Sequence, residues 1–335
     1  MADTFPLNSL YVDEAALGKF IEANRGHIMA IICYGVDCEP AKGAEFPVIY
    51  NHMEQLGGTK QVEVWTSSAP VSYHRADSFE YTENSEALFG QYLFKNDSSS
   101  DLEAATRLAY NSCLKETRAA GYPYLIRLWN YLPDINMVVD GLERYMRFCL
   151  GRHQALEENR LIFEKELPAA SALGTQGGRM SVFLLAAKTP GEPKENPRQV
   201  HAYEYPPQYG PRSPSFSRAM LKRWRGNKWD LFISGTASIV GHESQHPGDA
   251  VEQLQETLQN IETLIESATK DLNEEVYTVS DLSVLKVYIR HREHYPVVRE
   301  ALEQTLKGSL PTMYLLADVC RTNLLLEIEG VLHSK

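Results

Sequence analysis

The chain of 335 residues has 33 basic and 44 acidic side chains, a formal net charge of −11 with histidine neutral. Apolar residues make up 43% and charged residues 23%, which indicates a globular protein of about two domains. No apolar run reaches the roughly 20 residues that span a bilayer, and the acidic balance disfavours non-specific nucleic-acid binding. Five scattered cysteines make a disulfide framework unexpected and favour a cytoplasmic location.

The first half predicts a helix, a strand and a helix in that order. Apolar periodicity predicts a helix over residues 102–119, a strand over 124–131 and a second helix over about 136–151. A Gly- and Pro-rich stretch comes next, over residues 173–198. We place a boundary at its start, between domains of residues 1–172 and 173–335.

Residues 198–228 concentrate positive charge, with seven Lys or Arg side chains against one glutamate. Their Tyr and Pro content predicts a strand and a rigid loop, followed by a short helix over 215–222. The guanidinium groups of Arg212 and Arg218 could each grip a carboxylate with two parallel hydrogen bonds. Together with the hydroxyls of Tyr203 and Tyr209 they suit a small dicarboxylic acid. The alternatives are solvated or ion-paired surface charge, or an RNA-binding patch at residues 222–225.

The second half repeats the order of the first. It predicts a buried strand over residues 229–240, a loop over 242–248 and a helix of about 20 residues from Asp249. A strand over 283–290, a helix over 295–306 and strands over 312–320 and 324–331 complete it. Because helix, strand and helix recur, with Arg127 and Lys286 at matching positions, we expect two tandem α+β units of one plan.

The motif His242-Glu-Ser-Gln-His246 matches a zinc signature, H-E-x-x-H. Zinc chemistry requires both histidines on one face of a continuous helix. Here Gly241 precedes the motif and Pro247-Gly248 come directly after it, which predicts a turn. We therefore expect no metal site, with these side chains capping the next helix.

Cys320 and Glu327 lie seven residues apart, with three leucines before the glutamate. A carboxyl group in apolar surroundings has a raised pKa and can act as a general acid near neutral pH. The alternatives are a glutamate paired with an arginine on a strand edge, and a cysteine that is simply a small buried hydrophobe.

Four segments resemble the RidA/YjgF fold: residues 232–241, 247–249, 255–260 and 326–329. That resemblance implies mixed sheets with helices packed on one face, in units that form trimers with clefts between them. Its deaminases carry a carboxylate-binding arginine two residues after a proline, whereas Pro311 is followed here by Thr312 and Met313. We therefore do not expect imine-deaminase activity.

Longer stretches resemble the chorismatase family, within the same fold. These are residues 127–136, the segment 205–218 with its core Gln-Tyr-Gly-Pro-Arg-Ser-Pro-Ser-Phe, residues 233–249, and Cys320-Arg321 with Glu327-Ile-Glu329. The resemblance extends from about residue 60 to the C-terminus. It implies cleavage of chorismate with release of pyruvate, without a metal or another cofactor.

Family branches differ in product, and the hydrolase branch has alanine seven residues before the catalytic glutamate. Cys320 at that position, together with Gly235 at a second branch-specific position, implies a hydroxybenzoate-forming enzyme. The pattern is most similar to the branch that makes both 3- and 4-hydroxybenzoate, linked to xanthomonadin pigment and ubiquinone. The alternatives are a chorismate hydrolase and a non-catalytic RidA-like binding protein.

The resemblance also implies residue roles and an assembly. It implies Glu327 and Cys320 as catalytic residues. With the arginines and tyrosines above it implies a substrate site of Tyr203, Tyr209, Arg212, Arg218, Gly235 and Arg290. We expect either a homotrimer or a monomer with internal pseudo-symmetry. The sequence assigns no role to residues 1–60, and it does not predict the ratio of the two hydroxybenzoates.

Overall fold

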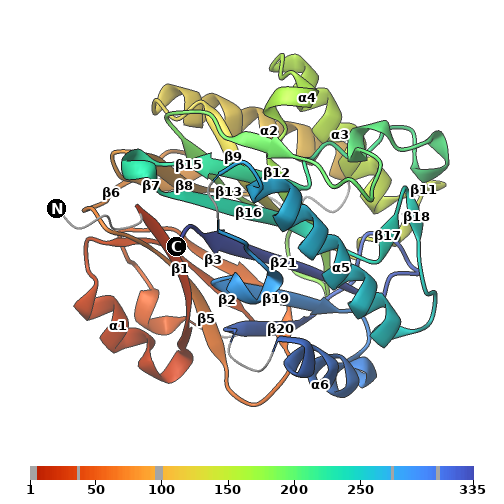
Figure 1. Ribbon diagram of the computed structural model, residues 1–335. Coiled ribbons are helices and arrows are strands. Elements are labelled where there is room, and N and C mark those ends of the chain that lie inside the picture. The colour runs from red at the N-terminus through yellow and green to blue at the C-terminus, as the bar shows by residue number, and fades with distance from the viewer. Residues whose placement is uncertain (1–5, 36–37, 95–100, 273–274, 307–309) are drawn as a thin grey trace.

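Apolar runs that are buried along nearly their whole length form the central strands of the protein. These are β2 (Ile28–Tyr34), β9 (Tyr124–Pro133), β16 (Trp229–Thr236) and β19 (Val284–Ile289). A strand that is buried on both faces cannot alternate apolar and polar residues, so the continuous run is the expected pattern. The computed structural model, which describes residues 6–35, 38–94, 101–272, 275–306 and 310–335, arranges these strands in three mixed sheets (Figure 1).

Each of the three sheets combines strands from different parts of the chain. The first has the order β1 (Leu7–Asp13), β5 (Gln61–Ser67), β2 and β3 (Val48–Asn51). The second has the order β12 (Ala169–Thr175), β9, β13 (Ser181–Ala187), β8 (Ala87–Tyr92), β7 (Phe79–Glu83) and β6 (Ser72–Arg75). The third has the order β14 (Glu192–Lys194), β15 (Ala219–Arg223), β16, β21 (Leu326–His333), β19, β20 (Thr312–Leu316) and β4 (Glu54–Gln55).

The second and third sheets have the same plan. Read from one edge, β12-β9-β13-β8-β7-β6 corresponds to β20-β19-β21-β16-β15-β14, and in each the first two strands are parallel. The first sheet repeats the leading four positions as β3-β2-β5-β1, again with a parallel first pair. The predicted α+β class and the recurrence of one unit are confirmed. The recurrence also extends into the N-terminal segment, to which sequence reasoning assigned no role.

Helices cover the outer faces of the sheets, whereas the inner faces pack against one another. In Figure 1, α2 (Leu102–Ala119) and α3 (Arg144–Glu158) lie along the top, and α5 (Ala250–Thr269) and α6 (Tyr295–Leu306) lie at the right. A smaller helix, α1 (Leu17–Ala23), covers the first sheet, and α4 (Phe163–Glu166) precedes β12. One buried cluster joins Trp65, Trp129 and Phe232, one from each sheet. The core is therefore shared by all three sheets.

Two predicted helices are different in the structure. Residues 219–223 form β15, which pairs antiparallel with β16, so the short helix predicted over 215–222 is wrong. Sheet hydrogen bonds to a neighbouring strand outweighed a weak local helical pattern. The helix predicted from about residue 136 begins only at Arg144, because a hairpin of β10 (Val138–Val139) and β11 (Leu142–Glu143) precedes it. Asp140-Gly141, both with positive φ, form its turn, a pairing typical of two-residue hairpins.

The predicted boundary between residues 172 and 173 lies inside β12. The second sheet ends with β13 at Ala187 and the third begins with β14 at Glu192, so the change of sheet falls between these two strands. Gly177 and Gly178, both with positive φ, lie between β12 and β13. These glycines, part of the Gly- and Pro-rich stretch, therefore form a turn between two strands of one sheet and do not mark a change of sheet. The division into two domains itself stays a prediction.

The cysteines differ from expectation at one place. Cys33 and Cys38 form a disulfide, whereas Cys113, Cys149 and Cys320 are free. The number and spacing of the cysteines did not predict this bond, which joins two residues five positions apart. Among the described residues, no helix is long and apolar enough to cross a membrane.

Candidate functional site

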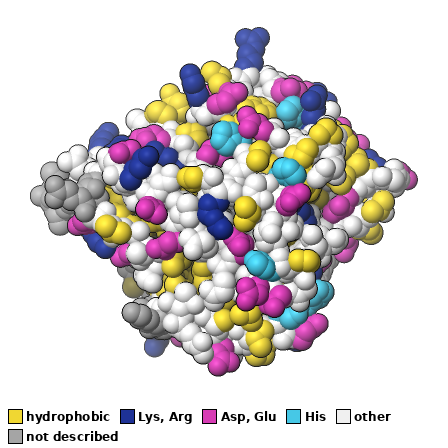
Figure 2. Space-filling model, turned by 45° about the vertical axis from the view of Figure 1, so that its right-hand side comes forward, with side chains coloured by type: hydrophobic (Ala, Val, Ile, Leu, Met, Phe, Trp, Pro, Cys, Tyr) yellow, Lys and Arg dark blue, Asp and Glu magenta, His cyan; other side chains and the backbone are white. Residues whose placement is uncertain are grey.

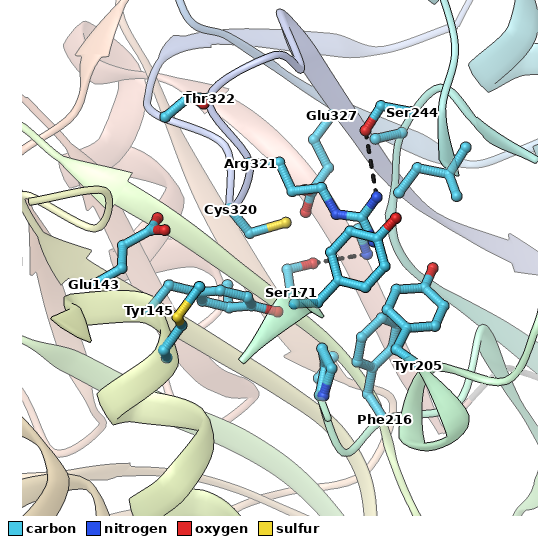
Figure 3. Close-up of a pocket in the computed structure, with 18 of the residues that line it drawn as sticks. Glu143, Tyr145, Ser171, Tyr205, Phe216, Ser244, Cys320, Arg321, Thr322 and Glu327 are labelled. Atoms are coloured by element: carbon cyan, nitrogen blue, oxygen red, sulfur yellow. Dashed lines mark hydrogen bonds between the residues drawn. The ribbon is translucent and has the colours of Figure 1, made fainter. Parts of the chain in front are cut away.

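A cavity of about 570 Å³ lies where the edge strand β12 of the second sheet meets the third sheet. A hydrogen bond of 2.9 Å beside the cavity joins the two sheets; the Ala170 amide of β12 donates it to Ser234 Oγ of β16. Its walls come from β12, α3, the segment before β15, β16, the β17–β18 hairpin (Ile239–Val240 and Glu243–Ser244) and the loop before β21. Figure 3 shows Tyr145, Cys320, Arg321 and Glu327 converging on this space.

Glu327 is placed in the cavity by the second position of β21, where it pairs in register with Tyr288 of β19. Its side chain is 5% exposed. Burial raises the pKa of Glu327 to about 8, and the negative charge of Glu329 adds to this, against the opposing effects of Arg127 and Arg218. The carboxyl group is therefore an acid at neutral pH, as the apolar sequence around it predicted.

Gly235 makes room for that carboxyl group. A Cβ atom on residue 235 would overlap Glu327 Oε1, so no larger residue fits without displacing the glutamate. The pairing of β16 with β21 is irregular between Ile233 and Thr236, which is typical of a site where a side chain approaches the backbone. The Gly235 amide donates a hydrogen bond of 2.9 Å to Ser171 Oγ at the cavity wall.

Cys320 lies in the loop between β20 and β21, and its thiol is partly exposed to the cavity. Burial, with the adjacent Glu327, raises the pKa of Cys320 to about 12. It is consequently a neutral thiol, able to fill space and to donate a weak hydrogen bond, rather than a thiolate nucleophile.

Two buried arginines face the cavity without a carboxylate partner in the described part of the chain. Arg152 of α3 is 3% exposed, lies against the rings of Tyr110 and Phe148, and has no hydrogen-bond partner at Nε and Nη2. Arg218 is 5% exposed; its Nη2 donates to Tyr205 OH at 2.8 Å and to the Val200 carbonyl oxygen at 2.9 Å, and its Nε has no partner. Its charge opposes the rise that burial causes in the pKa of Glu195, but no salt bridge joins these two side chains in the described part of the chain. Because a buried unpaired charge is costly, both groups are expected to receive an anion from a ligand.

A third arginine, Arg321, lies at the rim of the cavity. Its Nη1 donates to the His242 carbonyl oxygen at 2.8 Å, and its guanidinium lies 3.9 Å from the ring centre of Tyr209. Stacking on Tyr209 and bonding to the β17–β18 hairpin hold Arg321 in one orientation. The cavity therefore combines three guanidinium groups with three carboxyl groups, the neutral one of Glu327 and those of Glu143 and Glu243.

The structure brings five of the eight predicted site residues together. The cavity is lined by Tyr209, Arg218, Gly235, Cys320 and Glu327. Three others lie outside it: Tyr203 bonds to His201 Nδ1 at 2.9 Å and Arg212 is exposed at the surface. Arg290 lies beneath the loop of residues 317–325, where it pairs with Asp318 at 2.6 Å.

The basic segment over residues 198–228 is dispersed in the folded chain. Arg198 pairs with Glu256 and Arg223 pairs with Glu192, whereas Lys222 is buried and donates to Thr189 Oγ1. Only Arg218 among its seven cations lines the cavity. Clustering along the sequence did not become clustering in space. The segment runs through loops, short 3-10 turns and β15, so its cations point in different directions, and the two within β15, Lys222 and Arg223, face opposite sides of the sheet.

Sequence reasoning missed several lining residues, namely Tyr145, Arg152, Ser171, Tyr205, Phe216 and, as a site residue, Arg321. Arg152 gave a weak signal, since it follows Phe148 by four residues on the buried face of an amphipathic helix. An arginine at such a position is unusual unless a partner meets it there.

The zinc-like motif does not adopt the continuous helix that places both histidines of such a signature on one face. Glu243 and Ser244 belong to strand β18, and the two histidines contact different partners, His242 with Tyr209 OH and His246 with Glu256. Among the described residues, no group of three or more His, Cys, Asp and Glu side chains is placed to hold a metal ion.

Comparison with known proteins gives one consistent family. Residues 63–186 match the family model described as Chorismatase FkbO/Hyg5-like, N-terminal. The chain is 36% identical to a 3-hydroxybenzoate synthase of Streptomyces hygroscopicus, over 91% of both chains. It is 34% identical to a chorismatase of the same organism, over 95% of this chain and 90% of that protein.

A solved structure agrees over nearly the whole length. The crystal structure of a chorismatase matches with a TM-score of 0.87 at 30% identity, covering 97% of this chain and 98% of that one. Matches of this identity and coverage, on a chain whose cavity holds a buried acid and three arginines, show that the protein belongs to the chorismatase family.

Proposed function

We propose that this protein cleaves chorismate to pyruvate, 3-hydroxybenzoate and 4-hydroxybenzoate, with Glu327 as the general acid. The observation that carries the proposal is a buried carboxyl group, held as an acid above Gly235, in a cavity lined by arginines without carboxylate partners among the described residues. The names of the relatives, a 3-hydroxybenzoate synthase and chorismatases, support the same substrate.

Chorismate carries two carboxylates, and the cavity supplies matching charge. Arg152 comes from α3, which packs on the second sheet, and Arg218 comes from the segment before β15 of the third sheet. Each can therefore hold one carboxylate from its own wall of the cavity. A guanidinium grips a carboxylate through two charge-assisted hydrogen bonds. A cavity of about 570 Å³ lies in the usual size range for a small-molecule site.

The chemical step begins with transfer of the Glu327 proton to the methylene carbon of the enolpyruvyl group. The ether oxygen then carries positive charge, and the bond between it and the ring carbon breaks with both electrons going to oxygen. Pyruvate leaves with a ketone carbonyl group at its former enol carbon. The Glu327 carboxylate that remains accepts the proton released when the ring becomes aromatic, and the acid is restored.

Two outcomes are open to the ring. In the path implied for the 3-hydroxy product, the neighbouring hydroxyl attacks the carbon that pyruvate leaves, and the resulting arene oxide opens to the phenol. In the path to the 4-hydroxy product, the ring loses a proton and keeps its existing hydroxyl. Cys320, a neutral thiol beside Glu327, is placed to steer the opening and to exclude water that would give the hydrolysis product.

Pathway and assembly are part of the same proposal. The products would serve as precursors of xanthomonadin pigment and ubiquinone, as the sequence resemblance implies. The chain would act as a monomer with internal pseudo-symmetry, because one chain already contains three sheets of related order. Its predicted halves, residues 1–172 and 173–335, would contribute opposite walls of the site.

RNA binding, the other reading of the basic segment, has less support. The cations of residues 198–228 are partly buried or paired with glutamates. On the face shown in Figure 2, acidic and basic side chains are intermingled. A polyanion would meet no continuous positive surface there.

Chromatography of the products formed from chorismate tests this function. We expect pyruvate in equal amount to the sum of 3- and 4-hydroxybenzoate, and a shift toward the hydrolysis product or 4-hydroxybenzoate in Cys320→Ala. A dihydroxycyclohexadiene carboxylate as the main product of the unaltered protein would identify a hydrolase instead. Absence of pyruvate would identify a non-catalytic binding protein.

A further inference from the structure

Two glutamates on the same face of β21 have opposite surroundings. Glu327 and Glu329 are two residues apart, so both side chains point to the inner side of the sheet. Among the described residues, burial and nearby charges act on the Glu327 carboxyl group, and no hydrogen bond to it is formed. The Glu329 carboxyl group, by contrast, accepts four hydrogen bonds, from Arg127 Nη2 at 2.7 Å, Lys286 Nζ at 2.7 Å, Trp129 Nε1 at 2.9 Å and Ser171 Oγ.

The contacts of Glu329 fix it as an anion. Although burial would raise its pKa, Lys286 and Arg127 lower the pKa of Glu329 to about 2. Lys286 also pairs with Glu63 at 2.8 Å, and Glu63 is itself held by Trp65 Nε1 at 2.8 Å. The cluster therefore contains two buried cations and two buried anions, and every charge in it has a partner.

Ser171 connects this cluster to the cavity. Its hydroxyl accepts hydrogen bonds from Arg127 at 2.6 Å and from the Gly235 amide at 2.9 Å, and it donates to Glu329. The Ser171 hydroxyl and the Glu327 carboxyl group both lie against Gly235 at the cavity wall. The Glu329 carboxylate is thus connected to the site of Glu327 through Ser171. The Ser171 hydroxyl is bonded to Glu329 and, like the Glu327 carboxyl group, lies against Gly235.

The groups facing Glu327 come from every neighbouring element. Arg127 of β9, Arg218 before β15 and Glu329 on its own strand act most on the pKa of Glu327, and Tyr288 of β19, Tyr145 of α3 and Cys320 adjoin it. Four more charged side chains line the same cavity, namely Arg152, Arg321, Glu143 and Glu243. Among the three charged groups that act most on this pKa, Glu329 is the one anion, and Tyr145 and Cys320 are neutral near pH 7.

We propose that Glu329 is a positioning residue of this enzyme, a permanent buried anion that keeps Glu327 in its acid form. The inference deepens the proposed function, on which it rests, because only a general acid needs its proton held there. Without Glu329, the cations Arg127 and Arg218 would favour the ionised form of Glu327. Because Glu329 is already ionised and bound to Arg127, a further negative charge on Glu327 is disfavoured.

The test is the pH at which Glu327 loses its proton, measured in Glu329→Gln. The infrared band of a protonated carboxyl group, identified by its loss in Glu327→Gln, is followed as pH rises without substrate. We expect its midpoint to fall by about 1 pH unit in E329Q. An unmoved midpoint in folded E329Q would overturn the inference.

A second variant, expected to shift the midpoint in the opposite direction, distinguishes an electrostatic effect from a general loss of structure. Arg127→Gln removes a cation that favours the ionised form of Glu327, so its midpoint should rise. A fall in both variants would contradict the electrostatic role of Glu329. If E329Q alone does not fold, the charge-balanced pair E329Q/K286M serves in its place; a smaller downward shift is expected, because loss of the Lys286 cation acts in the opposite direction.

Glu63→Gln is the matched control. It removes an equal charge from the same cluster, but Lys286 lies between Glu63 and Glu329. The midpoint should move by less than half as much as in E329Q, and an equal movement would show that Glu329 has no special position. Pyruvate release is measured in parallel. A midpoint that falls while the pH profile of pyruvate release stays unchanged would refute Glu327 as the acid and leave the role of Glu329 intact.

Discussion

Glu327 and Glu329 show how strongly the fold can make the pKa values of two identical side chains differ. They share one strand and one face, yet burial raises the pKa of Glu327 to about 8, whereas the two cations beside Glu329 hold its pKa at about 2. One group can therefore deliver a proton near neutral pH, and the other remains a fixed charge. Pairs with such divergent environments mark acid–base roles in active sites.

The raised pKa of Glu327 predicts how activity and stability depend on pH. Because the acid form is required, kcat/KM should fall as pH rises through about 8. The folded state binds this proton more tightly than the unfolded chain. The stability that it contributes is therefore complete below the ordinary pKa of 4.5 and is lost as pH rises toward 8. A pH–rate profile that stays flat between pH 6 and about 10 would contradict this assignment.

Arg152 predicts an effect on substrate binding. Arg152→Met should raise KM by about tenfold or more, because a charge-assisted hydrogen bond to a carboxylate is lost. The melting temperature should not fall, since the substitution also removes a buried charge without a carboxylate partner among the described residues. The exposed Arg212 is the matched control, and Arg212→Met should leave KM unchanged. An equal KM for both variants would remove Arg152 from the site.

Sequence reasoning predicted the acid and the thiol but not the arginine that faces them. Glu327 follows three leucines, and local composition is enough to predict a carboxyl group in apolar surroundings. Arg152 lies on a helix packed on the second sheet, and the weak local signal that it is buried does not indicate which cavity it faces. Arg212 and Arg218 are close in sequence, yet one is exposed and the other is buried.

At the scale of elements, the loop of residues 317–325 carries Cys320 and Arg321 to the cavity. Arg290 holds it from below: its Nη2 donates to the carbonyl oxygens of Val319 at 2.7 Å and of Arg321 at 2.9 Å. Its Nε donates to that of Leu324 at 2.8 Å. A guanidinium saturated by these contacts acts as a scaffold for the loop and is not available to a substrate.

We expect Arg290→Met to loosen this loop. The variant should lose about 3 kcal/mol of unfolding free energy, because Asp318 and three carbonyl oxygens lose their partner. The ratio of hydroxybenzoate to hydrolysis product should also fall, as Cys320 loses its position. Arg292→Met, which breaks an exposed pair with Glu54, is the control and should change neither quantity. Unaltered products in R290M would show that the loop keeps its form without this contact.

Long elements were the easiest to predict. Helix α5 begins where predicted because Asp249 caps it, accepting from the amides of Val251 and Glu252 at 3.0 Å, and its apolar residues recur at helical spacing. The hairpin of β10 and β11 was missed, although Asp140-Gly141 is a strong turn pair, because the surrounding apolar spacing also fits a helix. Strand β15 was missed because it is only five residues long; hydrogen bonds to β14 on one side and β16 on the other fix it as a strand.

At the scale of the whole molecule, three sheets of related order enclose one core. Tyr34, Tyr131 and Tyr288 come from the corresponding strands β2, β9 and β19, and their hydroxyls are joined by contacts of 3.2 and 2.8 Å. Sequence comparison of the halves revealed two repeats but not the N-terminal one, which is shorter and shares few residue types. Equivalent folds need only equivalent burial, so residue identity can disappear while strand order is retained.

Lys286 binds the sheets to one another, and its loss should destabilise the whole chain. Lys286→Met leaves Glu63 and Glu329 buried with one fewer cation, at a cost of about 3–5 kcal/mol in unfolding free energy. Urea unfolding measures this cost. Lys42→Met, at an exposed pair with Glu39, should cost less than about 1 kcal/mol. Equal midpoints for the two variants would show that the buried cluster does not hold the sheets together.

The net charge of −11 is compatible with a dianionic substrate because the positive charge at the site is internal. The arginines that face the cavity come from α3, from the segment before β15 and from the loop before β21, and only one of them belongs to the basic segment of the sequence. Glu143 and Glu243 line the same cavity, so it is the fold, rather than the order of residues, that brings three arginines and these carboxyl groups around Glu327.

The rate of pyruvate release by Glu327→Gln tests the central claim most directly. Glutamine has nearly the volume of glutamate but no acidic proton, so the variant should keep the melting temperature and the affinity for chorismate. Its kcat should fall on the order of 10³-fold, the usual contribution of a general acid. A folded Glu327→Gln that binds chorismate and releases pyruvate at more than about a tenth of the original rate would contradict the assignment of Glu327 as the acid.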